Sequence, residues 1–170
     1  MQGNNPTSPP LLSVAACLMA LTLAACNPQG PTLDTAHGSH RALRAGGITS
    51  ESMITRDDPR LIAAADKHGI PHRFAFALVT AESRGNCRAR SSSNARGVTQ
   101  VLPATARSVG VYGNLFDCSV GLDAGFAYLR RVTAVHGFTC KGFTLYNYGE
   151  AATVGCQAYG RHIMSLANRY

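Results

Sequence analysis

The stretch PHRFAFALVTAES, residues 71–83, combines an apolar helical face with a single acid near its end. Its apolar residues recur at positions i, i+3, i+4 and i+7: Phe74, Ala77, Leu78 and Ala81. This spacing predicts an amphipathic helix with one face in a core. Glu82 is four residues beyond Leu78 and continues the same row. We therefore expect its carboxyl to leave the edge of the core and enter a cleft at the end of the helix.

The surroundings expected for Glu82 indicate a general acid. Burial disfavours the charged form of a carboxyl and raises its pKa above the reference value of about 4.3. A carboxyl that is protonated near neutral pH can donate a proton in a reaction. The alternative is that Glu82 lies on the helix flank and forms an ion pair with Arg84 or Arg88, which is a common structural arrangement. Helix position alone favours the ion pair, because structural ion pairs are commoner than catalytic acids.

The N-terminal segment predicts export. An apolar run from Leu11 to Ala25 is too short to span a membrane and is typical of a signal peptide, which we place at residues 1–25. The run ends in LAAC, residues 23–26, which resembles the lipobox of bacterial lipoproteins and implies cleavage before Cys26 and lipidation of its thiol. The segment before the run has no Lys or Arg, although export signals normally begin with positive charge. Ordinary cleavage with release of a soluble protein is the alternative.

The cysteines also fit an oxidising compartment. Cys17 falls in the signal and Cys26 at the lipid site, and the others make an even set: Cys87, Cys118, Cys140 and Cys156. In the periplasm they predict two disulfides, with three connectivities that the sequence does not resolve. We expect Cys87 to pair with Cys118 and Cys140 with Cys156. No C-x-x-C pair is present and the histidines lack ligand spacing, so no metal and no cofactor are expected.

The rest of the chain divides into a tether and one domain. Residues 26–56 are rich in Gly, Pro, Ser, Thr and His without an apolar period, which predicts a flexible tether. Residues 57–170 have the length of one small domain with one core. The formal net charge of +7 indicates anionic partners. Nucleic acid is disfavoured because the basic residues are dispersed, Trp is absent and export is expected, whereas cell-wall glycan with its peptide carboxylates fits that location.

Helix start and stop signals run through residues 57–170. We expect helices from Pro59 to Gly69, from Pro71 to Gly85, from Pro103 to Val109, from Asp117 or Ser119 to near Gly137, from Phe143 to Tyr148 and from Gln157 to Asn168. No stretch alternates convincingly at period two, so the fold is expected to be mainly α. The polar segment RARSSSNARGVTQ, residues 88–100, predicts a loop or small hairpin that forms one wall of a cleft, with Asn94 as a left-handed turn residue.

Four segments occur in the order and at the spacing of a known family: ALVTAESRGN, SSSNARGVTQVLPATA, NLFDCSVGLDAGFAYLRR and LYNYG. Together they make the chain resemble the soluble lytic transglycosylase family, from about Pro59 to the C-terminus. The resemblance implies a lysozyme-like α fold of the goose type, as a single domain over residues 57–170. It also implies cleavage of peptidoglycan.

The resemblance assigns roles to individual residues. The family's catalytic acid falls on Glu82. Substrate binding is implied for six residues: Ser83, Ser91, Gln100, Tyr146, Asn147 and Tyr159. Among them, Ser91 corresponds to the family's cleft serine, and Gln100 closes its Gly-Leu-Met-Gln motif. Taken singly, Tyr146 also fits a core aromatic, Gln100 a hydrogen bond in the loop wall and Ser91 an ordinary turn residue.

Several positions depart from the family's pattern. Thr99 and Leu102 stand where methionine is usual, which is expected to alter apolar contact with the sugar. Ser92 replaces a common proline. Tyr148 is bulkier than the family's alanine and is expected to narrow or reshape the cleft. None of these changes removes Glu82.

One carboxylate suffices where the substrate supplies its own nucleophile. Most glycosidases need two carboxyl groups, but the sequence places no other acid beside Glu82. The resemblance implies cleavage of the MurNAc-GlcNAc β-1,4 bond with formation of a 1,6-anhydroMurNAc end, assisted by the N-acetyl oxygen of the sugar. Glu82 would act first as acid and then as base.

Two alternatives stay open. A muramidase-type hydrolase would use Asp117 or Asp123 as a second carboxylate, and a non-catalytic peptidoglycan-binding or assembly lipoprotein would keep the fold without turnover. The expected location is the periplasm, on the inner leaflet of the outer membrane through a lipid anchor at Cys26; Asn27, rather than Asp, is consistent with such sorting. The sequence does not choose between wall turnover and assembly of a cell-envelope secretion apparatus as the role.

Overall fold

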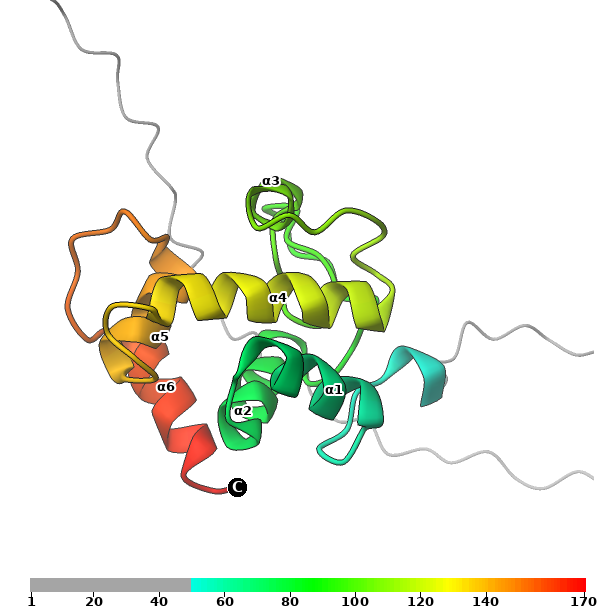
Figure 1. Ribbon diagram of the computed structural model, residues 1–170, viewed down its shortest axis with the longest axis horizontal. Coiled ribbons are helices and arrows are strands. Elements are labelled where there is room, and N and C mark those ends of the chain that lie inside the picture. The colour runs from blue at the N-terminus through cyan, green and yellow to red at the C-terminus, as the bar shows by residue number, and fades with distance from the viewer. Residues whose placement is uncertain (1–49) are drawn as a thin grey trace, which may run out of the picture. The chain divides into compact units, whose positions relative to one another are not determined.

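The computed structural model describes residues 50–170, which form six α-helices and one short 3-10 helix (Figure 1). In chain order these are η1 (Ser50–Ser52), α1 (Pro59–His68), α2 (His72–Ser83), α3 (Pro103–Ser108), α4 (Cys118–Thr133), α5 (Cys140–Tyr148) and α6 (Ala158–Ala167). Within this range the extended pairing amounts to isolated bridges, so the mainly α class is confirmed. None of the helices described has the length and apolarity needed to cross a bilayer. The expected signal peptide, the lipid site at Cys26 and most of the tether lie outside the described residues.

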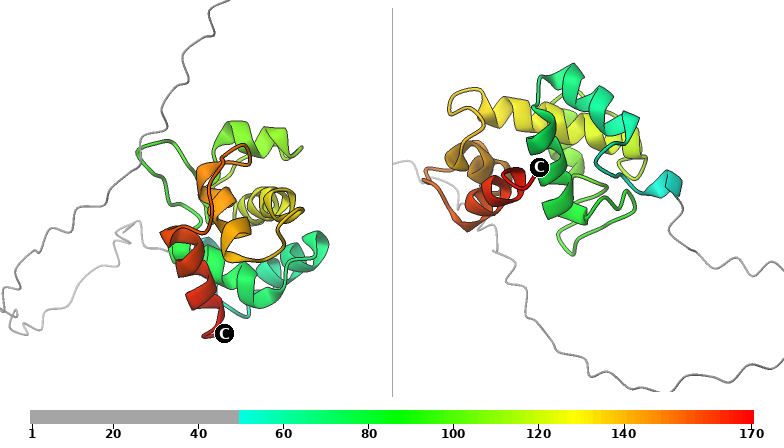
Figure 2. Two further views of the ribbon diagram at one scale, coloured as in Figure 1. Left: turned by 90° about the vertical axis from the view of Figure 1, so that its left-hand side faces the viewer. Right: turned by 90° about the horizontal axis from the view of Figure 1, so that it is seen from below.

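The central helix is α4. It packs against α1, α3 and α5, while α6 lies against α2 and α5 (Figures 1 and 2). Asp117 determines where α4 begins, because its side chain accepts two backbone N–H groups of the first turn. Leu122, Phe126 and Leu129 recur at helical spacing and are fully buried. The face predicted for this helix is therefore the one that enters the core.

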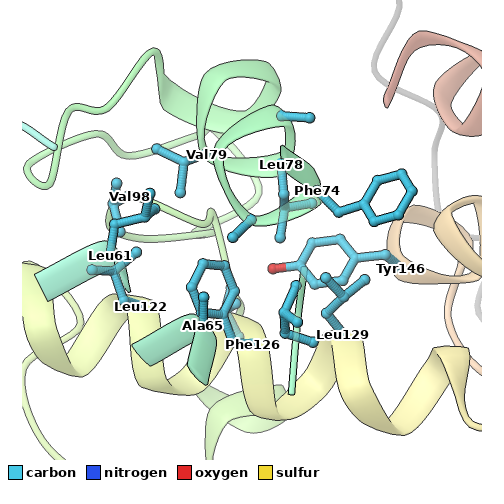
Figure 3. Packing of buried hydrophobic residues seen from close by; sticks show 14 of the residues in the cluster. Leu61, Ala65, Phe74, Leu78, Val79, Val98, Leu122, Phe126, Leu129 and Tyr146 are labelled. Carbon is cyan, nitrogen blue, oxygen red and sulfur yellow. The ribbon is translucent and has the colours of Figure 1, made fainter. Parts of the chain in front are cut away.

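The core fills the space between α2 and α4 (Figure 3). Leu78 of α2 and Phe126 of α4 are both fully buried there. Tyr146, contributed by α5, extends its hydroxyl into the same layer (Figure 3). Phe74 stacks on Phe138, with ring centroids 5.5 Å apart. Full burial of one such side chain stabilises the fold by about 1.5–3 kcal/mol.

The loop of residues 84–102, between α2 and α3, is fastened to α4 at Thr99. The Thr99 side chain is fully buried, and its Oγ1 donates a hydrogen bond to the carbonyl oxygen of Gly121 at 2.6 Å. A Cβ atom on Gly125 would lie only 2.4 Å from the Cβ of Thr99, so glycine is required for this approach. Asn94 has a φ of 66°, which confirms the expected left-handed turn.

The folded unit begins before Asp57, which corrects the expected end of the tether. Ile54 is buried, and its N–H donates to the carbonyl oxygen of Gly85 at 2.8 Å. The N–H of Cys87 donates to the carbonyl oxygen of Ser52 at 2.9 Å. This segment gave no apolar period in the sequence because its attachment rests largely on backbone hydrogen bonds.

Two helix ends also differ from expectation. α2 ends at Ser83, and Arg84, not Gly85, takes the left-handed capping conformation with a φ of 55°. Gly85 is needed for a different reason, since a Cβ there would lie 2.2 Å from the carbonyl oxygen of Ile54. α5 begins at Cys140, three residues earlier than expected, because the Thr139 side chain accepts a backbone N–H of the first turn.

Both disulfides have the pairing expected from the sequence. Cys87–Cys118 joins the loop of residues 84–102 to the start of α4, and Cys140–Cys156 joins the start of α5 to the segment before α6. The linked cysteines are 31 and 16 residues apart. Loops of these lengths restrict the unfolded chain, and each bond is worth about 3 kcal/mol by that effect.

We expect Gly125→Ala to lower the free energy of unfolding by about 1–3 kcal/mol, because the added methyl group overlaps Thr99 in a closely packed interior. Urea unfolding followed by circular dichroism measures the change. Gly155→Ala is the matched control, since a Cβ there meets nothing within 4 Å; its effect should stay within about 0.5 kcal/mol. Equal stability of the two variants would contradict the packing argument.

Candidate active site

Glu82 lies in the last turn of α2, one residue before the helix ends. Its side chain is partly buried, and Oε1 accepts a hydrogen bond from the hydroxyl of Tyr159, on α6. The pKa of Glu82 is raised to about 7. Burial causes the rise, and the hydrogen bond from Tyr159 already offsets part of it in that value. A carboxyl with this pKa is partly protonated at neutral pH, so it can both give and accept a proton there.

Glu82 forms no ion pair with any cation of residues 50–170. Arg84 and Arg88, the partners considered for a structural ion pair, are exposed and do not bond to it. The ion-pair interpretation is therefore wrong. The bonding partner of the carboxyl within the described chain is a neutral hydroxyl, which leaves burial to dominate its titration.

Tyr159 is held in place by a close contact between α5 and α6. A Cβ on Gly160 would lie 2.1 Å from the carbonyl oxygen of Cys140 and 2.5 Å from Oγ1 of Thr144, so the two helices touch at their backbones. The N–H of Gln157 donates to Oγ1 of Thr144 at 3.0 Å, which satisfies a backbone donor at the start of α6. The Cys140–Cys156 disulfide closes the same corner. The first turn of α6, which carries Tyr159, is thus fixed against α5.

Tyr146 is a buried neighbour of the acid. Its hydroxyl donates to the carbonyl oxygen of Thr99 at 2.9 Å, and its ring lies 5.3 Å from that of Tyr128, centroid to centroid. Burial and the nearby charge of Glu82 raise the pKa of Tyr146 well above its ordinary value, which keeps it neutral. The next residue, Asn147, is exposed, and its side chain makes no hydrogen bond within the described chain. Its amide is available to a ligand.

Two serines that were expected to bind substrate hold the local structure together. Ser83 Oγ donates to the carbonyl oxygen of Val98 at 2.7 Å and so ties the end of α2 to the loop of residues 84–102. Ser91 Oγ accepts the backbone N–H of Ala95 at 3.0 Å, which closes a turn within that loop. The Ser91 hydroxyl keeps its hydrogen available for one further bond.

Gln100 is also tied into the loop. Its side-chain NH2 group donates to the carbonyl oxygens of Ala89 at 3.1 Å and Gly97 at 2.8 Å. Its backbone has a φ of 50°, in the left-handed region. The side-chain carbonyl oxygen is therefore the atom through which Gln100 can meet a ligand.

Thr99, which was expected to alter apolar contact with the sugar, lies in the interior of the domain. Its side chain is fully buried, and both its hydroxyl and its carbonyl are used to fasten the loop. Leu102 and Tyr148, the other large departures, are 43% and 52% exposed. These two side chains remain accessible to a bound polymer.

The other acids bonded within residues 50–170 are engaged away from Glu82. Four of them pair with cations: Asp58 with Arg60, Asp66 with His72, Asp123 with Lys67 and His68, and Glu150 with Arg131. Asp117 caps α4. The same part of the chain brings no three His, Cys, Asp or Glu side chains together as a metal site would need.

A hollow of about 590 Å³ lies between α1 and the start of α4, and Glu82 is not among its lining residues. Asp123 lies at its edge. Burial works to raise the pKa of Asp123, but hydrogen bonds from Lys67 and His68 outweigh it and lower the pKa. Asp123 is thus an ionised, paired group, unlike Glu82.

Sequence reasoning missed two positioning residues, Thr99 and Thr144. Each is a buried threonine whose hydroxyl bonds to the backbone of a neighbouring segment. The available signal was a glycine inside a helix, Gly125 opposite Thr99 and Gly160 opposite Thr144. Glycine costs about 1 kcal/mol relative to alanine within a helix, so its presence there indicates a close approach.

We expect Glu82→Gln to stabilise the protein at pH 8 and to change its stability little at pH 4. Because the pKa of Glu82 rises from its ordinary 4.5 to about 7 in the folded protein, the folded state holds this proton longer than the unfolded state. The wild-type free energy of unfolding therefore falls as pH rises through this range. At 1.36 kcal/mol per pKa unit the loss is at most about 3 kcal/mol, and we expect a gain of about 1–3 kcal/mol for the variant.

Urea unfolding of wild type and variant at both pH values measures this difference. Glu51→Gln is the control, because Glu51 is exposed and its side chain makes no hydrogen bond within the described chain. A gain of the same size at pH 4 and pH 8 would show that the carboxyl's titration is not its cause.

Comparison with known proteins agrees with this geometry. A family model for the transglycosylase SLT domain matches residues 60–160, more than half of the chain. A transglycosylase of Enterobacteria phage PRD1 is 33% identical over 87 residues, which is 51% of this chain and 32% of that protein. Membrane-bound lytic murein transglycosylase F of Desulfosudis oleivorans is 31% identical over 81 residues, or 48% of this chain and 18% of that protein. The chain thus spans about a third or less of these relatives' length.

A solved structure shares the fold. The X-ray structure of an inactive mutant of the lytic transglycosylase Slt from Pseudomonas aeruginosa superimposes with a TM-score of 0.56 at 22% identity, over 64% of this chain and 22% of that one. The helical arrangement is accordingly of the lysozyme-like type. With the family model matched across most of the described helices, the chain belongs to the transglycosylase SLT domain family.

Proposed function

We propose that the protein is a peptidoglycan lytic transglycosylase in which Glu82 is the single catalytic acid and base. One observation carries the proposal: a partly buried carboxyl with a pKa of about 7, whose titration is governed by burial and Tyr159 rather than by a second carboxylate. The matched relatives from phage PRD1 and Desulfosudis oleivorans are named as transglycosylases, which supports this activity for the domain.

The reaction begins with proton donation. Protonated Glu82 gives its proton to the oxygen of the β-1,4 bond between MurNAc and GlcNAc, and the bond from C1 of MurNAc to that oxygen breaks. The N-acetyl oxygen of the same MurNAc forms a new bond to C1. A raised pKa suits this step, because the acid must be protonated near neutral pH.

The second step closes the sugar on itself. The C6 hydroxyl of MurNAc attacks C1 and displaces the N-acetyl oxygen, while the Glu82 carboxylate accepts the hydroxyl proton. The product is a 1,6-anhydroMurNAc end, and no water is consumed. An intramolecular nucleophile has a high effective concentration, so the site must mainly hold the ring in place.

Neighbouring residues divide between positioning and binding. Tyr159 orients the Glu82 carboxyl and stabilises its charged form after the proton has left, since its hydroxyl donates to Oε1. Asn147, the Ser91 hydroxyl and the side-chain oxygen of Gln100 offer polar groups for sugar recognition. Ser83 acts through the loop rather than on the sugar.

A muramidase-type hydrolase is disfavoured by the placement of its required second carboxylate. Asp117 caps α4, and Asp123 is held by Lys67 and His68 at 2.7 and 2.6 Å. A non-catalytic wall-binding protein is disfavoured by Glu82, because a protein that only binds has no need of a desolvated acid poised at neutral pH.

We also propose that the domain works in the periplasm, displayed on the inner leaflet of the outer membrane through a lipid on Cys26. The signal-like segment before Cys26 supports export. Two disulfides in the described region support an oxidising compartment. Local opening of the wall, for turnover or for a secretion apparatus, fits a domain of this size.

The products of a sacculus digest test the reaction. We expect wild-type protein to release muropeptides lighter by one water than hydrolysis products, and Glu82→Gln to lower the rate by at least about a hundredfold, in the range of general acid catalysis. Mass spectrometry reads the ends, and Glu51→Gln serves as the folded control. Reducing ends would indicate a hydrolase, and equal activity of wild type and Glu82→Gln would remove Glu82 from the mechanism.

The pH dependence tests the role of Tyr159. The rate should fall as pH rises through the pKa of Glu82, since the acid loses its proton. Tyr159→Phe removes a hydrogen bond that lowers this pKa, so the fall should move to higher pH by up to about one unit. Initial rates between pH 5 and 9 measure the shift, and an unchanged or lower midpoint would contradict the assignment.

A further inference from the structure

Acidic residues are absent from one long stretch of the chain that follows Glu82. Residues 83–116 contain no Asp or Glu but five basic residues, all of them arginine: Arg84, Arg88, Arg90, Arg96 and Arg107. Four of the five lie in the loop of residues 84–102. The loop therefore carries a local charge of +4 without an internal counterion.

Three of these arginines are exposed and make no side-chain bond within the described chain: Arg84, Arg88 and Arg90. Arg96 differs, because Asn94 Oδ1 accepts two hydrogen bonds from its guanidinium at 3.1 Å and its charge lies 5.9 Å from the Phe116 ring centre. Elsewhere in residues 50–170, Arg60, Lys67 and Arg131 have carboxylate partners. Three exposed guanidinium groups without a carboxylate partner are thus concentrated within seven consecutive positions of this loop.

The loop holds these arginines on a rigid frame. The Cys87–Cys118 disulfide lies beside Arg88, and Gln100 donates a hydrogen bond to the carbonyl of Ala89, between Arg88 and Arg90. Arg90 and Arg96 face each other as an antiparallel bridge, which directs their side chains to the same face. A frame of this kind lowers the entropy lost when the arginines bind a ligand.

The frame is also joined directly to the acid. The loop continues from the end of α2, and the Ser83 hydroxyl bonds it back to that helix at Val98. Thr99 receives the hydroxyl of Tyr146, a neighbour of Glu82. The loop that carries the arginines is therefore bonded both to α2, which carries Glu82, and to Tyr146 of α5.

We propose that Arg84, Arg88 and Arg90 bind the carboxylates of the peptide stems carried by the glycan strand. This inference rests on the proposed function for its substrate class. The sugar whose bond is broken is the one that bears a stem, and a stem of a few residues, at about 3.3 Å per residue, extends roughly 10–15 Å from it. Arginine suits this ligand because its planar guanidinium matches a carboxylate with two parallel hydrogen bonds.

The inference makes the loop a specificity-determining surface. Glycan that carries acidic stems should bind better than bare glycan, and the difference should weaken with salt because exposed charges are screened over about 10 Å at 0.1 M ionic strength. Glu82 would select the bond, and the loop would select strands whose stems are still attached.

Binding in a Glu82→Gln background tests this without cleavage. The ligands are glycan strands immobilised with their stems, and the same strands after an amidase has removed the stems. The variant R88Q/R90Q removes two loop charges, and the control R130Q/K141Q removes two exposed, unpaired charges from α4 and α5. We expect R88Q/R90Q to bind stem-bearing strands at least about fivefold more weakly at low salt, and the control to bind as its parent does.

The difference in binding between R88Q/R90Q and its parent should disappear on strands without stems and at high salt. Equal weakening on stripped strands, or an equal effect of the control, would overturn the proposal. So would loss of binding to phosphatidylglycerol vesicles with stem binding unchanged, which would assign the loop to lipid headgroups. If R88Q/R90Q lowers the urea midpoint, Arg84→Gln at the first position of the loop replaces it. This experiment measures binding without cleavage. A negative result would therefore overturn stem recognition by the arginines, whereas a negative product analysis would overturn the proposed reaction.

Discussion

Thr99 is fully buried where the loop of residues 84–102 meets α4, and the arrangement around Glu82 depends on that contact. Its hydroxyl bonds to the Gly121 carbonyl, and its own carbonyl accepts the hydroxyl of Tyr146. Gly125 leaves the space that the Thr99 side chain fills. One residue thus connects the loop with α4 and α5. Because Ser83 bonds the same loop to α2, the acid and the wall beside it cannot move independently.

The electrostatics of the domain follow from which charges are paired. Asp58, Asp123 and Glu150 each have a cation within bonding distance, whereas Glu82 has a tyrosine hydroxyl. Burial without a counterion raises the pKa of Glu82, as low polarity always does for an unpaired carboxyl. This costs folding stability at neutral pH, and such a cost is typical of sites kept for chemistry. The unpaired loop arginines differ from Glu82 because they are exposed to water, where a charge without a partner lowers the folding stability little.

In the mechanism and binding that we propose, Tyr159 and the loop arginines have different tasks. Tyr159 reaches Glu82 because Gly160 and Thr144 bring the backbones of α5 and α6 into contact. Its position therefore depends on a helix interface, which is well suited to holding a proton donor in a fixed geometry. The arginines extend from a loop stiffened by a disulfide, which suits recognition of a flexible, charged substituent.

Local sequence signals were enough to predict most helices and the position of Glu82 near the end of one of them. Periodicity placed Glu82 on the row of Phe74 and Leu78, and capping residues located α1 and α4, because these signals arise from contacts within a few positions along the chain. The even number of cysteines after the predicted signal and lipid site likewise predicted two disulfides. Family resemblance implied only that Tyr159 binds substrate, and its hydrogen bond to Glu82, 77 positions away, was not expected.

The contacts between distant segments became known from the three-dimensional structure. It showed that the buried Thr99 fastens the loop of residues 84–102 to α4, and that Ile54 is joined to the domain through the backbone of Gly85. It also showed that Glu82 accepts a hydrogen bond from a hydroxyl group, not an ion pair from an arginine, and that its pKa is raised. The reason is physical: burial and pKa depend on which distant segments exclude water from a group, and a linear pattern does not contain that information.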